Sequence, residues 1–116
     1  MLANAQRLSF AKQPLIERWS GLVVGYSGVD WIDIEGRQCL EFGYRLVPGA
    51  RGRGYATEGS RALLARAAGD FEGELLAIID PVNAASRHVA AKLGFALSKR
   101  AIIDGCVRDV HRLHIG

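Results

Sequence analysis

A chain of 116 residues, of which 49% are hydrophobic and 23% charged, has the size and composition of one small soluble globular domain. No apolar run approaches the length of a membrane span and residues 1–10 lack the pattern of a secretory signal, so we expect a cytoplasmic protein without a membrane partner. The net charge of +3 comes mostly from scattered arginines, which disfavours a nucleic-acid partner. Cys39, Cys106 and the three histidines lack metal-ligand spacing, so no metal site is expected.

The first half of the chain is predicted to consist mainly of strands. Residues 8–12 are a short candidate strand, and residues 13–19 are ambiguous and fit a turn plus a helical fragment. A strand over residues 22–31, rich in β-branched and aromatic side chains, precedes a turn signal at Glu35-Gly36-Arg37. A further strand is expected over residues 39–47 and is ended by Pro-Gly.

The second half is predicted to alternate helices and strands. Residues 55–68 have helical periodicity and are expected to stop at Gly69, while residues 74–79 form the short apolar run of a central strand. Asn83 is a candidate N-cap for a helix that ends at Gly94-Phe95. Residues 97–103 and 107–115 are predicted to form a closing β-hairpin. The predicted class is therefore α/β (α+β), in one domain that spans residues 1–116.

The stretch 46–58 is the most informative part of the sequence. It predicts an extended strand that enters a glycine-rich turn and then opens a helix, which is a phosphate-binding geometry because the first amides of a helix have no intrahelical partner. It is not a P-loop, since Gly54 is followed by Tyr55 rather than lysine, and it is not a dinucleotide fingerprint, since Gly52-x-Gly54 leads to Thr57. An ATPase or a dehydrogenase is therefore disfavoured.

Three blocks of sequence resemble one enzyme superfamily. Arg51-Gly52-Arg53-Gly54-Tyr55-Ala56 matches R-x-x-G-x-A, the acetyl-CoA-binding motif of the GNAT N-acetyltransferases. The segment from Asn83 to Phe95 resembles N-x-x-S-x-x-V-x-x-K-L-G-F of the same superfamily, especially its ribosomal-protein-alanine acetyltransferase branch, and the segment from Glu41 to Leu46 resembles that branch's E-x-G-Y-x-L strand. The resemblance covers roughly residues 21–114.

The resemblance implies a fold and a chemistry. The fold is a GNAT-like mixed, mostly antiparallel central sheet flanked by helices, and relatives carry an additional first strand and one or two helices before Leu8 that are expected to be absent here. Acetyl-CoA is the implied cosubstrate and no metal is needed. By resemblance, Leu46 and Val47 offer backbone groups to the pantetheine arm, and the diphosphate is held by Arg51, Gly52, Arg53, Gly54, Tyr55, Ala56 and Thr57.

The catalytic residues are expected on two different elements. Glu41 on the strand that feeds the site is a candidate general base, although an ordinary ion pair with an arginine would equally explain it. Many relatives carry a tyrosine acid where this chain has Ala90, so Ser86 is the candidate donor to the leaving thiolate. Ser86 also fits a residue that supports the helix start, and Asn83 fits both a cap and a pantetheine contact.

The predicted activity is transfer of an acetyl group to an amine by direct attack in a ternary complex, because no cysteine lies at the thioester end of the motif. A protein N-terminal amine and a small amine both remain open as acceptor. A module that binds or senses acyl-CoA with reduced catalysis is the alternative. A homodimer, paired through the C-terminal strands, is expected to cover the edges of a short sheet.

Overall fold

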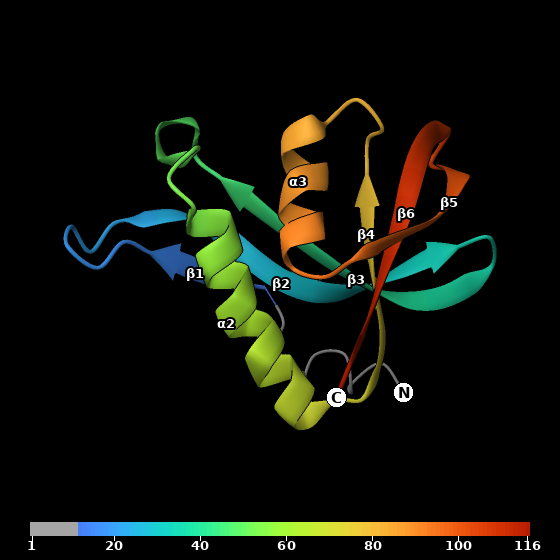
Figure 1. Cartoon of the computed structure of the whole chain (residues 1–116), viewed down its shortest axis with the longest axis horizontal. Helices are drawn as coiled ribbons and strands as arrows, with labels where there is room; N and C mark the ends of the chain where they lie inside the picture. The colour runs from blue at the N-terminus through green and yellow to red at the C-terminus, as the bar shows by residue number, and fades with distance from the viewer. Residues whose placement is uncertain (1–11) are drawn as a thin grey trace.

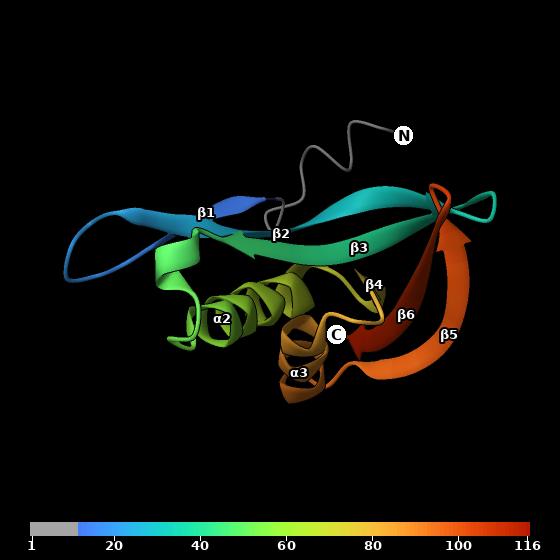
Figure 2. The ribbon, with the colours of Figure 1, turned by 90° about the horizontal axis from the view of Figure 1, so that it is seen from above.

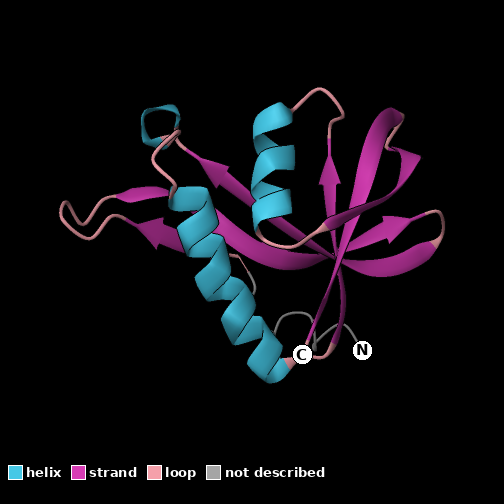
Figure 3. Cartoon of the chain, viewed as in Figure 1, coloured by secondary structure: helices cyan, strands magenta, loops and turns pink. Residues whose placement is uncertain are grey.

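The computed structural model describes residues 12–116, so that most of the candidate strand at residues 8–12 lies outside the described residues. The elements are shown in Figures 1 and 3 and follow in chain order: β1 (Gln13–Ile16), β2 (Val23–Ile34), β3 (Arg37–Leu46), the 3-10 turn η1 (Pro48–Ala50), α2 (Tyr55–Asp70), β4 (Gly73–Ile79), α3 (Ala84–Lys92), β5 (Ala96–Ile103) and β6 (Cys106–Ile115). No helix within residues 12–116 is long and apolar enough to span a membrane.

The strands form one mixed sheet in the order β1-β2-β3-β4-β6-β5. Only β3 and β4 run parallel, and every other neighbouring pair of described strands is antiparallel. Both helices lie on the same side of β2 and β3, as Figure 2 shows. The predicted mixed, mostly antiparallel sheet with helices packed on it is confirmed.

The main core lies between the helices and the sheet. Apolar side chains from β2, β3 and β4 meet those of α2 and α3, and Phe42 stacks on Phe95 with ring centroids 5.6 Å apart. A smaller cluster on the opposite face of the sheet joins Ile34, Leu76, Ala101 and Val110. Since β4 contributes apolar side chains to both clusters, its nearly continuous hydrophobic run has a structural reason.

Two local predictions differ from the structure. Residues 13–16, expected as a turn or helical fragment, form β1 because they pair with β2 from Gln13↔Ser27 onward, and Pro14 is tolerated in a strand at the end of the sheet order. Gly69 does not stop α2, which continues to Asp70 before Phe71 closes it with an N–H bond to the Ala67 carbonyl. Long-range pairing with β2 therefore decided the structure of residues 13–16. Gly69 was accommodated inside the helix rather than ending it.

Candidate functional site

The sheet opens between its two parallel strands. Within the described residues, β3 and β4 pair at the single position Glu41↔Leu76, and Figure 1 shows the two strands diverging beyond it. A cavity of about 220 Å³ fills this gap, lined by Glu41, Phe42, Gly43, Tyr44, Ala77, Ile78, Ile79, Ser86 and Ala90. The divergence therefore gives the sheet an opening in which an extended ligand can lie beside strand backbone.

The backbone of β3 presents polar groups to this gap. The N–H of Val47 donates to the carbonyl of Val24 on β2, at 2.9 Å. Because successive strand residues point their N–H and C=O groups to opposite sides, the groups of Tyr44 and Leu46 face the gap instead. The Val47 N–H is therefore already bonded within the sheet, whereas the backbone groups of Leu46, and also those of Tyr44, are directed toward the gap.

The glycine turn has the conformation that the sequence predicts. Gly52 and Gly54 have φ angles of 78° and 77°, a left-handed conformation that glycine adopts without strain. The N–H of Glu58 makes the first helical bond, to the Gly54 carbonyl at 3.0 Å, and Gly54 provides no side-chain cap. The N–H groups of Tyr55, Ala56 and Thr57 therefore have no intrahelical acceptor, and the helix dipole adds positive potential around them.

A larger cavity joins the glycine turn to the opened sheet. It measures about 600 Å³ and lies between the end of β3, the start of α2 and one face of α3, lined by Tyr44, Arg45, Leu46, Arg51, Gly52, Gly54, Tyr55, Ala56, Thr57, Asn83, Ala85, Ser86, His88, Val89 and Lys92. Tyr44 and Ser86 line both this cavity and the gap between the strands. Nearly all the predicted ligand-binding residues thus surround one continuous groove.

The two arginines of the turn have different surroundings. Arg51 lines the large cavity and forms no ion pair with a residue in the range 12–116, whereas Arg53 is absent from the cavity lining. The guanidinium of Arg53 instead pairs with Glu17, with Nη1 to Oε2 at 3.5 Å. The opposite wall supplies Lys92 and His88 from α3. Free positive charge therefore lies on both sides of the groove.

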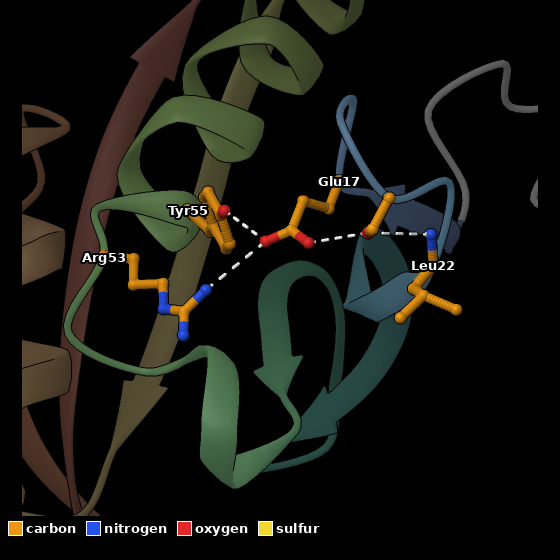
Figure 4. Close-up of polar contacts among 5 residues, drawn as sticks. Glu17, Leu22, Arg53 and Tyr55 are labelled. Carbon is orange, nitrogen blue, oxygen red and sulfur yellow. Dashed lines mark hydrogen bonds and ion pairs between the residues drawn. The ribbon is translucent and has the colours of Figure 1, made fainter.

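Glu17 anchors the glycine turn from outside the motif (Figure 4). This glutamate is 8% exposed and accepts hydrogen bonds from the Ser20 hydroxyl at 2.6 Å and from the Tyr55 hydroxyl. The hydrogen bonds from Ser20 and Tyr55, followed by the charge of Arg53, hold the pKa of Glu17 below its usual value. Sequence reasoning missed this residue, because a lone glutamate before β2 gives no local signal of a contact with the turn.

The start of α3 places Asn83 and Ser86 beside the groove. The Asn83 side chain accepts from the Ser86 N–H at 3.0 Å, which is the predicted N-cap. The Ser86 hydroxyl is left for other partners and accepts from the Tyr44 hydroxyl, with the two oxygens 3.5 Å apart. Asn83 and Ser86 can therefore both support the start of α3 and line the groove.

Glu41 stands between the groove and a second pocket. It lines the gap between the strands and also a pocket of about 400 Å³ formed by Lys12, Tyr26, Ser27, Gly28, Val29, Asp30, Glu41, Gly43, Tyr44 and Arg45. Burial, followed by the nearby charge of Asp30, raises the pKa of Glu41. Glu41 forms no ion pair within residues 12–116, so the ordinary arginine pair is not found. A half-buried carboxylate with this environment is suited to exchange a proton.

These features define an α/β domain in which a helix start with unpaired amides continues into an opened sheet. The acetyltransferase (GNAT) domain model matches residues 3–96, and the chain therefore belongs to the GNAT acetyltransferase family. It is 36% identical over 84 residues to the uncharacterized protein YkkB of Bacillus subtilis (strain 168), a match that covers 72% of this chain and 49% of that protein. The chain thus spans about half the length of this curated relative.

Solved structures share the fold. A putative GnaT-family acetyltransferase from Bordetella pertussis matches with a TM-score of 0.80 and 23% identity, over 96% of this chain and 70% of that one. A phosphinothricin acetyltransferase from Sinorhizobium meliloti, in complex with AcCoA, matches with a TM-score of 0.77 and 19% identity, over 99% and 66%. The ribosomal-protein-S5-alanine acetyltransferase from Vibrio fischeri matches with a TM-score of 0.76 and 18% identity, over 98% of this chain and 67% of that one. The predicted resemblance to the GNAT superfamily is confirmed.

Proposed function

We propose that this domain transfers an acetyl group from acetyl-CoA to an amine within a ternary complex. The observation that carries this proposal is the continuous groove from the unpaired amides of Tyr55, Ala56 and Thr57 to the gap beside Glu41. A diphosphate fits the amide end, because it is anionic and rich in acceptors, and an amide-bearing arm fits beside β3. The complex of the Sinorhizobium meliloti relative with AcCoA supports the same choice of ligand.

The proposed reaction needs a proton acceptor, an oxyanion donor and a donor to the leaving group, and the groove has a candidate for each. The amine nitrogen attacks the thioester carbonyl carbon and passes a proton to Glu41, directly or through water. The Leu46 N–H, which faces the gap, would stabilise the negative charge on the carbonyl oxygen. When the carbon–sulfur bond breaks, the Ser86 and Tyr44 hydroxyls are the side-chain donors in the gap that can hydrogen-bond the thiolate. The thiolate takes up a proton from solvent as it leaves, and Glu41 returns the proton of the amine to solvent, so that the balance is closed.

Two measurements test this function. Calorimetric titration with acetyl-CoA should show binding, and a thiol-release assay over a panel of amines should show turnover that Glu41→Gln lowers strongly. Tight binding without turnover on any amine, unchanged by Glu41→Gln, would instead support an acyl-CoA-binding module. If acetyl-CoA does not bind at the glycine turn, both the acetyltransferase and the acyl-CoA-binding module are overturned.

We also infer a homodimer in the cytoplasm. β5 is the last strand of the sheet order and leaves Leu97 and Ile102 63% and 71% exposed. Apolar side chains on a terminal strand favour pairing with a second copy through the C-terminal strands. A monomeric mass by light scattering at micromolar concentration would contradict the dimer.

A further inference from the structure

The pocket on the far side of Glu41 is built in rows. Residues that pair directly across β2 and β3 share a face of the sheet, and so do alternate residues along each strand. The registered pairs Asp30↔Glu41, Gly28↔Gly43 and Tyr26↔Arg45 therefore follow one another along this face. Members of all three pairs line the pocket. On β2 and β3 the middle row consists of two glycines, which leaves a trough between an acidic row and a row that carries Arg45.

Lys12 adds a second positive charge to the trough. Gln13 pairs with Ser27, and continuing that register by one residue puts Lys12 opposite Gly28. Lys12 and Gly28 both line the pocket. Neither Lys12 nor Arg45 forms an ion pair with a residue of the described chain, and both side chains are exposed. The pocket therefore combines two carboxylates at one end with two unpaired cations along its length.

The spacing of the rows sets the size of a complementary ligand. A strand rises about 3.3 Å per residue, so the Lys12 and Arg45 rows lie about 7 and about 13 Å from the acidic row along the sheet. Arginine and lysine side chains are long enough to reach several ångströms from their own row toward the acidic row. A ligand with its amine at Glu41 can thus place an anionic group a few bonds away against a cation.

We propose that the acceptor is an amine that also carries an anionic group, such as a carboxylate, which binds in the trough against Lys12 and Arg45. The inference rests on the proposed function and adds the class of acceptor. A diamine would satisfy Asp30 and Glu41 but would meet unpaired positive charge along the trough. A simple alkylamine would leave both cations without a partner. An amino acid, or a short peptide with an acidic side chain, complements the whole pocket.

The test compares matched pairs of acceptors. Rates of acetylation are measured for glycine, γ-aminobutyrate and ε-aminocaproate against the primary alkylamines of the same length, and for glycyl-aspartate against glycyl-asparagine. The wild type should prefer an anionic member in kcat/KM, and Arg45→Gln or Lys12→Gln should reduce that preference by roughly threefold to tenfold. Arg37→Gln, on the same strand but outside the pocket lining, is the matched control and should leave the preference unchanged.

A binding readout separates this inference from the proposed activity. Titration of the protein–CoA complex with the same compounds measures the preference without turnover, so it can hold even where no acetylation is seen. Absence of acetylation with every amine would refute the proposed function alone. Equal or tighter binding of alkylamines or of putrescine, or a preference that survives Arg45→Gln combined with Lys12→Gln, would overturn the anionic acceptor.

Discussion

The hydroxyl oxygens of Tyr44 and Ser86 lie 3.5 Å apart, one on β3 and the other on α3, and the tyrosine donates to the serine. Both residues line the gap between β3 and β4 and the larger groove. The rest of the gap is formed by apolar side chains, by Gly43 and by Glu41. Since Ala90 supplies no polar group, this hydroxyl pair is what the gap offers to a leaving thiolate.

Removing either hydroxyl should slow the reaction without weakening CoA binding. We expect Tyr44→Phe and Ser86→Ala each to lower kcat by roughly tenfold, and the double variant to lose less than the product because the two hydroxyls act together. Steady-state kinetics and calorimetry with CoA give the two readouts. Ser98→Ala on the exposed part of β5 is the matched control for the serine. Unchanged kcat in both variants would show that another group assists the thiolate.

The pH dependence of the activity should report Glu41. A general base must be deprotonated, and burial raises the pKa of Glu41, so activity should rise with pH through a value above that of an ordinary glutamate. Glu41→Gln should abolish this rising limb of the pH–activity profile and lower kcat by roughly a hundredfold. Asp30→Asn should move the limb to lower pH, because it removes the second cause of the raised pKa. A limb that stays in Glu41→Gln would rule out this glutamate as the base.

The raised pKa of Glu41 also predicts how the stability of the fold depends on pH. A raised pKa in the folded state means that folding favours the protonated carboxyl. Glu41 therefore contributes stability at low pH, which is lost as the pH rises through the raised value. Glu41→Gln should melt at a higher temperature than the wild type above that pH and at a similar temperature below it. Calorimetric melting curves over a range of pH provide the comparison.

Local signals were sufficient to predict most of the groove. The two glycines of the turn need their left-handed backbone, and Asn83 has a side chain that caps a helix, so each acts on its own neighbours in the sequence. Glu17 and Tyr44 carry no such signal. Their importance comes from contacts 38 and 42 residues away in the sequence, with Tyr55 and Ser86. Long-range pairing also decided the strand at residues 13–16, where propensity alone was ambiguous.

The arginines of the turn provide a matched comparison within one loop. Arg51 lines the groove without an ion pair, whereas Arg53 is held by Glu17. Arg51→Gln should raise the Kd for CoA by roughly tenfold, with a weaker dependence on salt, and Arg53→Gln should change it by less than about threefold. Calorimetry at two ionic strengths measures both effects. An equal increase of the Kd for CoA in the two variants would mean that Arg53 leaves Glu17 when the ligand binds.

Glu17 should hold the turn in its binding conformation. Glu17→Ala removes the acceptor of the Tyr55 and Ser20 hydroxyls, so we expect a lower melting temperature and a Kd for CoA higher by roughly threefold to tenfold. Because the folded-state pKa of Glu17 is lowered, its stabilising effect is present above the ordinary glutamate value and is lost as the pH falls through the lowered one. The melting difference between wild type and Glu17→Ala should therefore shrink in acid. A constant difference would count against the ionised contact.

Two glycines in and beside α2 should respond in opposite ways to the same substitution. An added Cβ meets nothing within 4 Å at either Gly54 or Gly69, so space does not distinguish them. Gly54 has φ 77° and opens the helix, and Gly54→Ala should destabilise the fold by about 1–2 kcal/mol and disturb the amides that face the groove. Gly69 lies inside the helix, where Gly69→Ala should stabilise by about 0.5–1 kcal/mol and leave CoA binding intact. Denaturant unfolding and calorimetry measure both pairs of values, and a Gly54→Ala variant that binds CoA as the wild type does would remove the left-handed turn from the binding mechanism.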